Sequence, residues 1–263
     1  MRCDFPILEY DSDQTARIEP TAVVPDGTLP EICIISFFAD AIERFVSNAN
    51  ATVACRFDTM ISSHPVYEFS YKERRLALLP AGLGGPLSVG LLEHAIAMGS
   101  RYFVVCGAAG VLNKEIAAGH LILPTAAIRD EGTSYHYLPP AREVVPSAAA
   151  VAAIGKVLED ANIPVVRGKT WTTDAYFRET RRKIELRQSE DCICVEMEAA
   201  ALFSVAVFRG VDLGYILYGG DSVAGVWDPR EEFDRAVVRE RLIRLSCEAC
   251  CLLADQTNVL RHK

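Results

Sequence analysis

Short apolar runs alternate with amphipathic segments along most of this chain. Apolar runs bounded by glycine, proline or polar residues predict strands, whereas apolar residues repeating every three to four positions predict helices. The predicted strands cover residues 31–37, 66–71, 75–82, 102–110, 120–128, 164–173, 191–197 and 213–221. The predicted helices cover residues 38–48, 87–99, 147–162, 179–188, 199–210 and the chain from about residue 229 onward.

This alternation predicts an α/β fold with a mixed, largely parallel central β-sheet flanked by helices. The chain has 263 residues, of which 50% are hydrophobic, and this is enough apolar surface for one large core. It shows no repeat, no low-complexity tract and no linker. We therefore expect a single domain over residues 1–263.

Charge and hydropathy exclude two classes of partner. The formal net charge is −8 and the basic residues are scattered, so no basic patch is available to bind nucleic acid. No apolar run approaches the roughly 20 residues that span a bilayer, so we expect no membrane segment. The first residues lack the basic start and apolar core of a signal peptide. We therefore expect a cytoplasmic protein.

The nine cysteines lie mostly inside apolar runs, where a free cysteine behaves as a small buried hydrophobe. Cys247 and Cys250 have the CxxC spacing of many zinc sites. A zinc site needs a second pair of ligands, and the chain beyond Asp221 holds a single histidine. We therefore interpret these cysteines as helix-packing residues and expect no metal.

Four predicted strands end in residues suited to a binding site. In open α/β sheets, ligands bind beyond the carboxyl ends of the strands. The sequences at these ends are AGLGGP (81–86), CGAAG (106–110), TTDAYF (172–177) and YGGDS (218–222). We therefore expect the site at this edge of the sheet.

Asp221 ends an apolar strand, where its carboxyl group is expected to lie in a cleft. Partial desolvation of the ionised form would raise its pKa, which suits a general acid. The alternative is an aspartate that caps the following turn or helix. Position alone leaves both interpretations open.

Glu196 and Glu198 flank Met197 where a predicted strand gives way to a helix. Because the backbone period changes there, one carboxylate can face the cleft while the other caps the helix or pairs with a basic group. Met197 offers a soft apolar surface to a sugar ring. The alternative, acidic residues favoured by a helix N-terminus, accounts for one glutamate better than for both.

Tyr176 and Phe177 follow a predicted strand end and can form one wall of a slot for a flat ring. An aromatic pair taken alone is more often part of a core. The glycine-rich ends, including Gly84, can present N–H groups to an anion, although most glycine turns only reverse the chain. His136 lies in a polar loop and is interpreted by default as a surface histidine.

Together these motifs resemble the nucleoside phosphorylase and nucleosidase superfamily, which includes purine nucleoside phosphorylases, uridine phosphorylases and methylthioadenosine nucleosidases. The resemblance covers residues from about 31 to 228. Its most specific part is VEMEAAALF (195–203), followed by the strand that ends in Asp221. RDEGTSYHY (129–137) resembles the uridine phosphorylase loop, and CGAAGVL (106–112) resembles the superfamily's glycine turn.

The resemblance assigns roles to individual residues. It implies that Glu198 holds the ribose 2′ and 3′ hydroxyls, with Met197 against the sugar and Glu196 beside them. A carboxylate that accepts hydrogen bonds from these hydroxyls binds the sugar more strongly as the sugar becomes oxocarbenium-like. Asp221 would protonate or hydrogen-bond the departing base. The implied base-binding residues are Tyr176, Phe177, Ala109 and Gly110.

The phosphate site departs from the family pattern. The family's arginine and its serine or threonine around the glycine turn correspond to Val105 and Ala108, and a second arginine is replaced near Ser62. The usual glycine and arginine pair near residues 35–39 is also missing. Either a relocated basic residue supplies the charge or the nucleophile is water. The residues proposed to hold phosphate are Gly84, Ala108, Arg129 and Arg56.

The expected function is phosphorolysis of a purine-like nucleoside to free base and ribose 1-phosphate, with inorganic phosphate as co-substrate and no cofactor. The segment FRETRR (177–182) lacks a clear uridine-type glutamine and arginine, which disfavours a pyrimidine. The alternatives are a nucleosidase that uses water and a catalytically silent nucleoside-binding protein. A Rossmann dehydrogenase is excluded because no GxGxxG follows an early strand. The resemblance also implies a homo-oligomer built from dimers, up to a hexamer.

Overall fold

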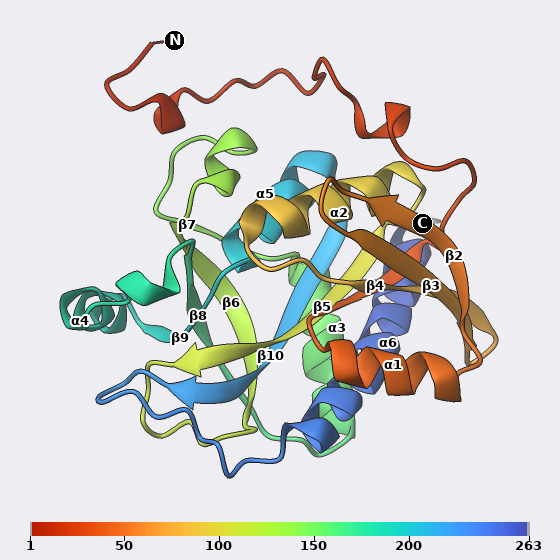
Figure 1. The fold of residues 1–263 in the computed structure, drawn as a ribbon. Helices are drawn as coiled ribbons and strands as arrows, with labels where there is room; N and C mark the ends of the chain where they lie inside the picture. The colour runs from red at the N-terminus through yellow and green to blue at the C-terminus, as the bar shows by residue number, and fades with distance from the viewer. Residues whose placement is uncertain (1, 262–263) are drawn as a thin grey trace.

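A computed structural model describes residues 2–261 of the protein. In this part of the chain one mixed sheet contains ten strands (Figure 1). The strands are β1 (Ile32–Ser36), β2 (Thr52–Asp58), β3 (Ser63–Tyr71), β4 (Arg74–Pro80), β5 (Tyr102–Val111), β6 (Leu121–Asp130), β7 (Glu143–Val144), β8 (Val165–Thr173), β9 (Cys192–Glu196) and β10 (Asp212–Ser222). The α-helices are α1 (Ala39–Asn48), α2 (Gly85–Ala97), α3 (Ala148–Asp160), α4 (Arg181–Ser189), α5 (Ala199–Arg209) and α6 (Arg235–Arg261).

The sheet closes on itself through two short antiparallel contacts. β5 pairs with β10, β6 with β8, and β8 with β9, all in parallel. Short antiparallel pairings of β9 with β5 and of β10 with β6 complete a ring. From β5 the sheet continues in parallel to β1 and β4, and then in antiparallel to β3 and β2. The ring gathers the ends of β5, β8, β9 and β10 around one region.

Helices cover both faces of the sheet, which is why its central strands are apolar throughout. All five residues of β1 are buried. Cys33 and Ile35 pack in the core with α2 and α5, whereas Ile32 and Ile34 pack with α1, α3 and α6. Alternate side chains of one strand thus reach two helical layers. The predicted α/β fold with a mixed, largely parallel sheet is confirmed.

Local capping chemistry sets several helix ends. The Ser147 hydroxyl accepts the Ala150 N–H at 3.4 Å at the start of α3. α5 ends at Arg209 and is followed by Gly210, which adopts the left-handed conformation with φ 65°. Three predictions need correction. The sequence does not predict β2, whose side chains are mostly exposed and lack alternation, or β7, which has only two residues. In addition, α6 begins at Arg235 rather than near residue 229.

The CxxC cysteines pack within α6, the longest helix, against the sheet. Cys247 and Cys250 are fully buried. The Cys250 thiol donates to the Tyr102 carbonyl at 3.2 Å, and burial raises the pKa of that thiol. Neither cysteine is exposed to react with solvent. Within residues 2–261, no helix, α6 included, is both long and apolar enough to cross a membrane.

The segment of residues 2–30 contributes no strand and runs as an arm along one side of the domain (Figure 1). It contains two short 3-10 helices, η1 (Pro6–Leu8) and η2 (Pro20–Ala22). The second lies against α2, and η1 lies against the short helix η3 (Thr133–His136). Apolar side chains of the arm, including Phe5 and Ile18, remain exposed.

Candidate active site

A cavity of about 560 Å³ opens at the ends of β5, β9 and β10. The short helix η4 (Tyr176–Arg178), which follows β8, forms another side of it. The residues that line the cavity are Gly110, Tyr176, Phe177, Glu179, Val195, Glu196, Met197, Asp221, Val223 and Trp227. Segments more than one hundred residues apart in the chain therefore meet in one cavity.

Asp221 projects from the end of β10 into this cavity. Its Oδ2 accepts a hydrogen bond from the Trp227 indole Nε1–H at 2.8 Å. The loop that carries Trp227 is pinned by two backbone hydrogen bonds between Ser222 and Asp228, of 2.8 and 2.9 Å. A side chain at Gly110 would bring a Cβ to 3.4 Å from Asp221 Oδ1. The indole thus orients one oxygen of the Asp221 carboxylate, and the other oxygen lies next to Gly110.

Tyr176 and Phe177 form an aromatic wall of the same cavity. Their ring centroids lie 4.2 Å apart with an interplanar angle of 43°. Tyr176 is 50% exposed and Phe177 is 85% exposed, so these rings do not belong to a packed core. Exposed aromatic faces beside a carboxyl group can stack on a flat heterocycle while the acid binds its edge.

Glu196 lines the cavity, but its carboxylate oxygens are occupied by protein donors. Oε1 accepts hydrogen bonds from the hydroxyls of Thr170 at 3.2 Å and Thr172 at 2.6 Å. Oε2 accepts the N–H groups of Glu198 at 2.8 Å and Ala199 at 2.6 Å, at the start of α5. Glu196 therefore anchors the helix N-terminus, and sugar binding by it would require these bonds to break.

Glu198 and Met197 lie beside the cavity and differ in exposure. Met197 lines the cavity, whereas Glu198 is buried and is not among the described residues that line it. The Glu198 carboxylate accepts the N–H groups of Gly84 at 2.6 Å and Met197 at 3.2 Å. Burial, followed by the charge of Glu196, raises the pKa of Glu198. The two glutamates thus separate into a capping carboxylate and a buried carboxylate that is held by backbone N–H groups.

The two glycine-rich segments where phosphate was expected differ in surroundings, because Gly84 precedes α2 whereas Gly107 and Ala108 lie within β5 and form no turn. The Gly84 N–H already donates to Glu198. Ala108 is exposed, but its neighbour Gly107 lies against aromatic rings. A Cβ at Gly107 would come within 2.8 Å of the Tyr215 hydroxyl and 3.3 Å of the Phe37 ring. These surroundings supply backbone donors and apolar surface, with no cationic side chain among these contacts.

The two arginines predicted to bind phosphate are placed elsewhere. The Arg129 guanidinium donates to the Ser134 hydroxyl at 2.8 Å, to the Pro139 carbonyl at 2.7 Å and to the Leu138 carbonyl at 3.2 Å. The Arg129 side chain therefore stabilises the loop of residues 134–139. Arg56 is exposed on β2 and is not among the described residues that line the Asp221 cavity. Ala109 is buried in β5 and is likewise not among those lining residues.

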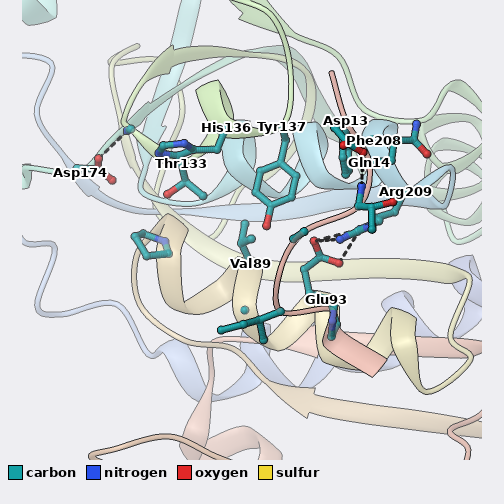
Figure 2. Close-up of a pocket in the computed structure, with 17 residues that line it drawn as sticks. Asp13, Gln14, Val89, Glu93, Thr133, His136, Tyr137, Asp174, Phe208 and Arg209 are labelled. Carbon is teal, nitrogen blue, oxygen red and sulfur yellow. Dashed lines mark hydrogen bonds and ion pairs between the residues drawn. The ribbon is translucent and has the colours of Figure 1, made fainter. Parts of the chain in front are cut away.

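A second hollow, of about 690 Å³, lies under the N-terminal arm (Figure 2). His136 of the predicted uridine-type loop lines this hollow rather than the Asp221 cavity. Glu93 forms a bidentate ion pair with Arg209 there, with N–O distances of 2.8 to 3.1 Å. This hollow is larger, but the charges of its Glu93 and Arg209 side chains neutralise each other. The Asp221 cavity, where carboxyl groups and exposed aromatic rings meet, is therefore the candidate active site.

Residues 31–252 match the family model described as the phosphorylase superfamily. The chain belongs to this superfamily. The resemblance inferred from the sequence motifs is thereby confirmed. Membership, together with relatives that are named phosphorylases, supports a pentosyltransferase of the nucleoside phosphorylase type.

Individual members of the superfamily are similar over most of the chain. A guanosine phosphorylase of Halorubrum lacusprofundi is 25% identical over 244 residues, which cover 89% of this chain and 99% of that protein. A uridine phosphorylase structure from Vibrio fischeri has a TM-score of 0.74 at 23% identity and covers 89% of this chain and 97% of its own. An AMP nucleosidase structure from Bacteroides thetaiotaomicron has a TM-score of 0.72 at 19% identity, and the match covers 88% of this chain and 91% of the nucleosidase chain. The two structural matches establish the shared superfamily fold.

Sequence reasoning missed four residues that line the cavity in this superfamily member, Val195, Val223, Glu179 and Trp227, of which the last two carry polar groups. Glu179 follows the aromatic pair by two positions, and Trp227 follows Asp221 by six. The placement of Glu179 at the end of a short 3-10 helix and the return of the Trp227 loop depend on tertiary contacts. A sequence signal existed in each case: a carboxylate close to exposed aromatics, and one of only two tryptophans in a polar loop.

Proposed function

We propose that this protein cleaves the N-glycosidic bond of purine nucleosides with inorganic phosphate, giving the free base and ribose 1-phosphate. One observation carries the proposal: the Asp221 carboxyl group shares a cavity with the exposed aromatic pair and with Met197. This arrangement offers a stacking surface for a base, an acid at its edge and an apolar contact for the sugar. No metal or organic cofactor is required.

In the proposed mechanism, the base stacks on Tyr176 and Phe177 while Asp221 donates a proton or hydrogen bond to a ring nitrogen. Protonation withdraws electrons from the glycosidic bond, so the base leaves as a neutral species. Glu198 exchanges its backbone donors for the ribose hydroxyls. Its negative charge stabilises the positive charge that develops on the sugar as the bond breaks.

Two features support a purine over a pyrimidine as the base. The guanosine phosphorylase noted above is similar over nearly its whole length. The residues after the aromatic pair are Arg178 and Glu179, and no glutamine lies among the described residues that line the cavity.

Hydrolysis is the second candidate, and it is favoured by one specific observation. The described residues that line the Asp221 cavity include no lysine, arginine or histidine. Arg129 is engaged by its own loop, and Val105 is fully buried inside β5. Each charge-assisted hydrogen bond that phosphate lacks removes about 1.5 to 3 kcal/mol of binding free energy. Water needs no such counter-charge.

Phosphate dependence separates the two candidates. We expect guanosine or inosine to be cleaved in millimolar phosphate with ribose 1-phosphate as the sugar product, and much more slowly in phosphate-free buffer. The sugar product should be identified by chromatography, with sulfate at equal ionic strength as the control. Free ribose formed at the same rate in both buffers would instead establish a nucleosidase.

We also propose that the protein is a homo-oligomer built from dimers. Exposed apolar side chains on the N-terminal arm and at the β2–β3 turn support it, including Ile18, Met60 and Ile61. Burial of such side chains favours association. Light scattering at micromolar concentration should therefore give at least twice the mass of one chain. A monomer under these conditions would refute this expectation.

A further inference from the structure

The two oxygens of the Asp221 carboxyl group have different surroundings. Oδ2 accepts the Trp227 indole Nε1–H at 2.8 Å, and within residues 2–261 this is the only hydrogen bond or ion pair of the carboxyl group. An indole nitrogen donates and cannot accept. A proton on Oδ2 would weaken this bond, because a hydroxyl oxygen is a poorer acceptor than a carbonyl or carboxylate oxygen. The indole therefore favours the acidic proton on Oδ1.

Oδ1 lies on the side of the cavity where a base is expected. A Cβ at Gly110 would lie 3.4 Å from Oδ1, so the glycine leaves open the space beside this oxygen. Gly110 lines the cavity together with Tyr176 and Phe177. Oδ1 has no hydrogen-bond partner in the part of the chain that the structure describes. A proton on Oδ1 is therefore available to a base that fills the cavity.

We propose that Trp227 is a positioning residue for the acid: its indole holds Oδ2, so that the proton rests on Oδ1 and passes from there to a ring nitrogen of the base. This inference rests on the proposed function, because it concerns the proton transfer in that reaction. During transfer the Oδ1–H bond breaks, an N–H bond forms on the base, and the electron pair of the glycosidic bond moves onto the base. Asp221 is left as a carboxylate, whose negative charge the indole N–H stabilises.

The loop that carries Trp227 is fixed at its base but exposed at its tip. Ser222 and Asp228 exchange two backbone hydrogen bonds, whereas Val226 is 95% exposed and Trp227 is 64% exposed. The bond to Asp221 is thus the polar contact that ties the indole to the cavity. A base in the cavity displaces water from around this bond, and hydrogen bonds are stronger in less polar surroundings.

A purely structural role for Trp227 is the alternative. Its side chain lines the Asp221 cavity and also a neighbouring cavity of about 580 Å³ between α4 and the loop. A wall between two cavities acts through the shape of the ring, whereas positioning of the acid acts through the indole N–H. Phenylalanine keeps an aromatic surface and removes the N–H, so Trp227→Phe distinguishes the two roles.

Trp227→Phe should lower kcat for a purine nucleoside about 10- to 100-fold, with little change in KM, because one hydrogen bond to a charged acceptor is lost during proton transfer. Activity on nitrophenyl riboside, whose nitrophenolate group departs without protonation, should stay near that of the wild type. Trp227→His keeps a ring N–H and should recover part of the nucleoside activity. Melting temperatures of both variants establish that they are folded.

A double-mutant cycle shows whether Trp227 acts through Asp221. Asparagine has no proton to place, so Trp227→Phe should cause no further loss of nucleoside cleavage in the Asp221→Asn background. Val226→Ala is the matched control, because Val226 is adjacent in the loop and is not among the described residues that line the Asp221 cavity. It should behave as the wild type does.

Three results would overturn the inference. They are an unchanged kcat in folded Trp227→Phe, equal losses on the nucleoside and on nitrophenyl riboside, and losses that add in the double variant. The first would show that the N–H is not needed, and the other two would show that the ring acts independently of the proton on Asp221.

Failure of the proposed function gives a different result. The protein contains two tryptophans, and the indole of the buried Trp171 donates to Asp130 at 2.9 Å. In NMR spectra, Asp221→Asn should shift the indole N–H signal that is absent from Trp227→Phe and leave the Trp171 signal in place. Such a shift in a protein that cleaves no nucleoside would support the placement of the Asp221 proton and overturn the proposed function. A Trp227 signal that Asp221→Asn does not move would overturn the inference.

Discussion

Asp221→Asn should slow cleavage of purine nucleosides about a hundredfold to ten-thousandfold, because asparagine cannot transfer a proton to the departing base. The amide is nearly isosteric and keeps an oxygen to accept the Trp227 indole N–H. The cavity should therefore keep its shape. The expected result is a lower kcat in steady-state assays with little change in melting temperature.

A substrate with a good leaving group identifies the step that is lost. The nitrophenolate group of nitrophenyl riboside departs without protonation, so the Asp221→Asn variant should retain most of its activity on this substrate. Asp228→Asn is the matched control, because Asp228 lies in the same loop and accepts the Arg230 N–H at 2.9 Å outside the cavity. Equal losses on nucleoside and nitrophenyl riboside would show that Asp221 positions or folds the site instead.

Glu198→Gln should lower turnover more than it weakens substrate binding. The sugar is neutral in the ground state and positively charged in the transition state, so the lost charge matters mainly during bond cleavage. Loss of charge-assisted hydrogen bonds to the ribose hydroxyls predicts a decrease of about tenfold to a thousandfold in kcat. The measurement is kcat and KM for one nucleoside in wild type and variant.

The 2′-deoxy form of the same nucleoside provides the control for Glu198. It lacks one of the two hydroxyls that Glu198 is proposed to bind. The Glu198→Gln substitution should therefore lower kcat by a smaller factor for the deoxynucleoside than for the ribonucleoside. Glu196→Gln should behave differently, because Glu196 caps α5 and holds two threonine hydroxyls. We expect that variant to lower the melting temperature. Turnover equal to wild type in Glu198→Gln would remove Glu198 from the mechanism.

Much of the fold could be predicted from the sequence, because burial in a layered α/β domain imposes local patterns. The apolar run of β1 and the segment that forms α3 were recognisable from their composition and periodicity. The strand-to-helix change at residues 195–199 was equally clear from its composition. β2 escaped detection because an edge strand with exposed side chains carries no such pattern.

The candidate site could be predicted in part, since its residues follow strand ends. Asp221, Met197 and Tyr176 were each expected near a ligand, and the structure brings all three into one cavity. Arg129 and Arg56 were candidates for phosphate by residue type alone. Their actual neighbours, loop carbonyls for Arg129 and solvent for Arg56, depend on chain segments that no local pattern identifies.

The sequence by itself determined most of the helices and strands, the superfamily to which the chain belongs, and the positions of its acids and aromatic pair along the chain. Only the tertiary structure decided that Glu196 caps α5 while Glu198 takes the Gly84 N–H, and that the Trp227 indole orients Asp221. The physical reason is the separation along the chain of the residues that each property depends on. Periodicity records which face of an element is buried, whereas a hydrogen bond across 114 residues depends on strand register and loop closure.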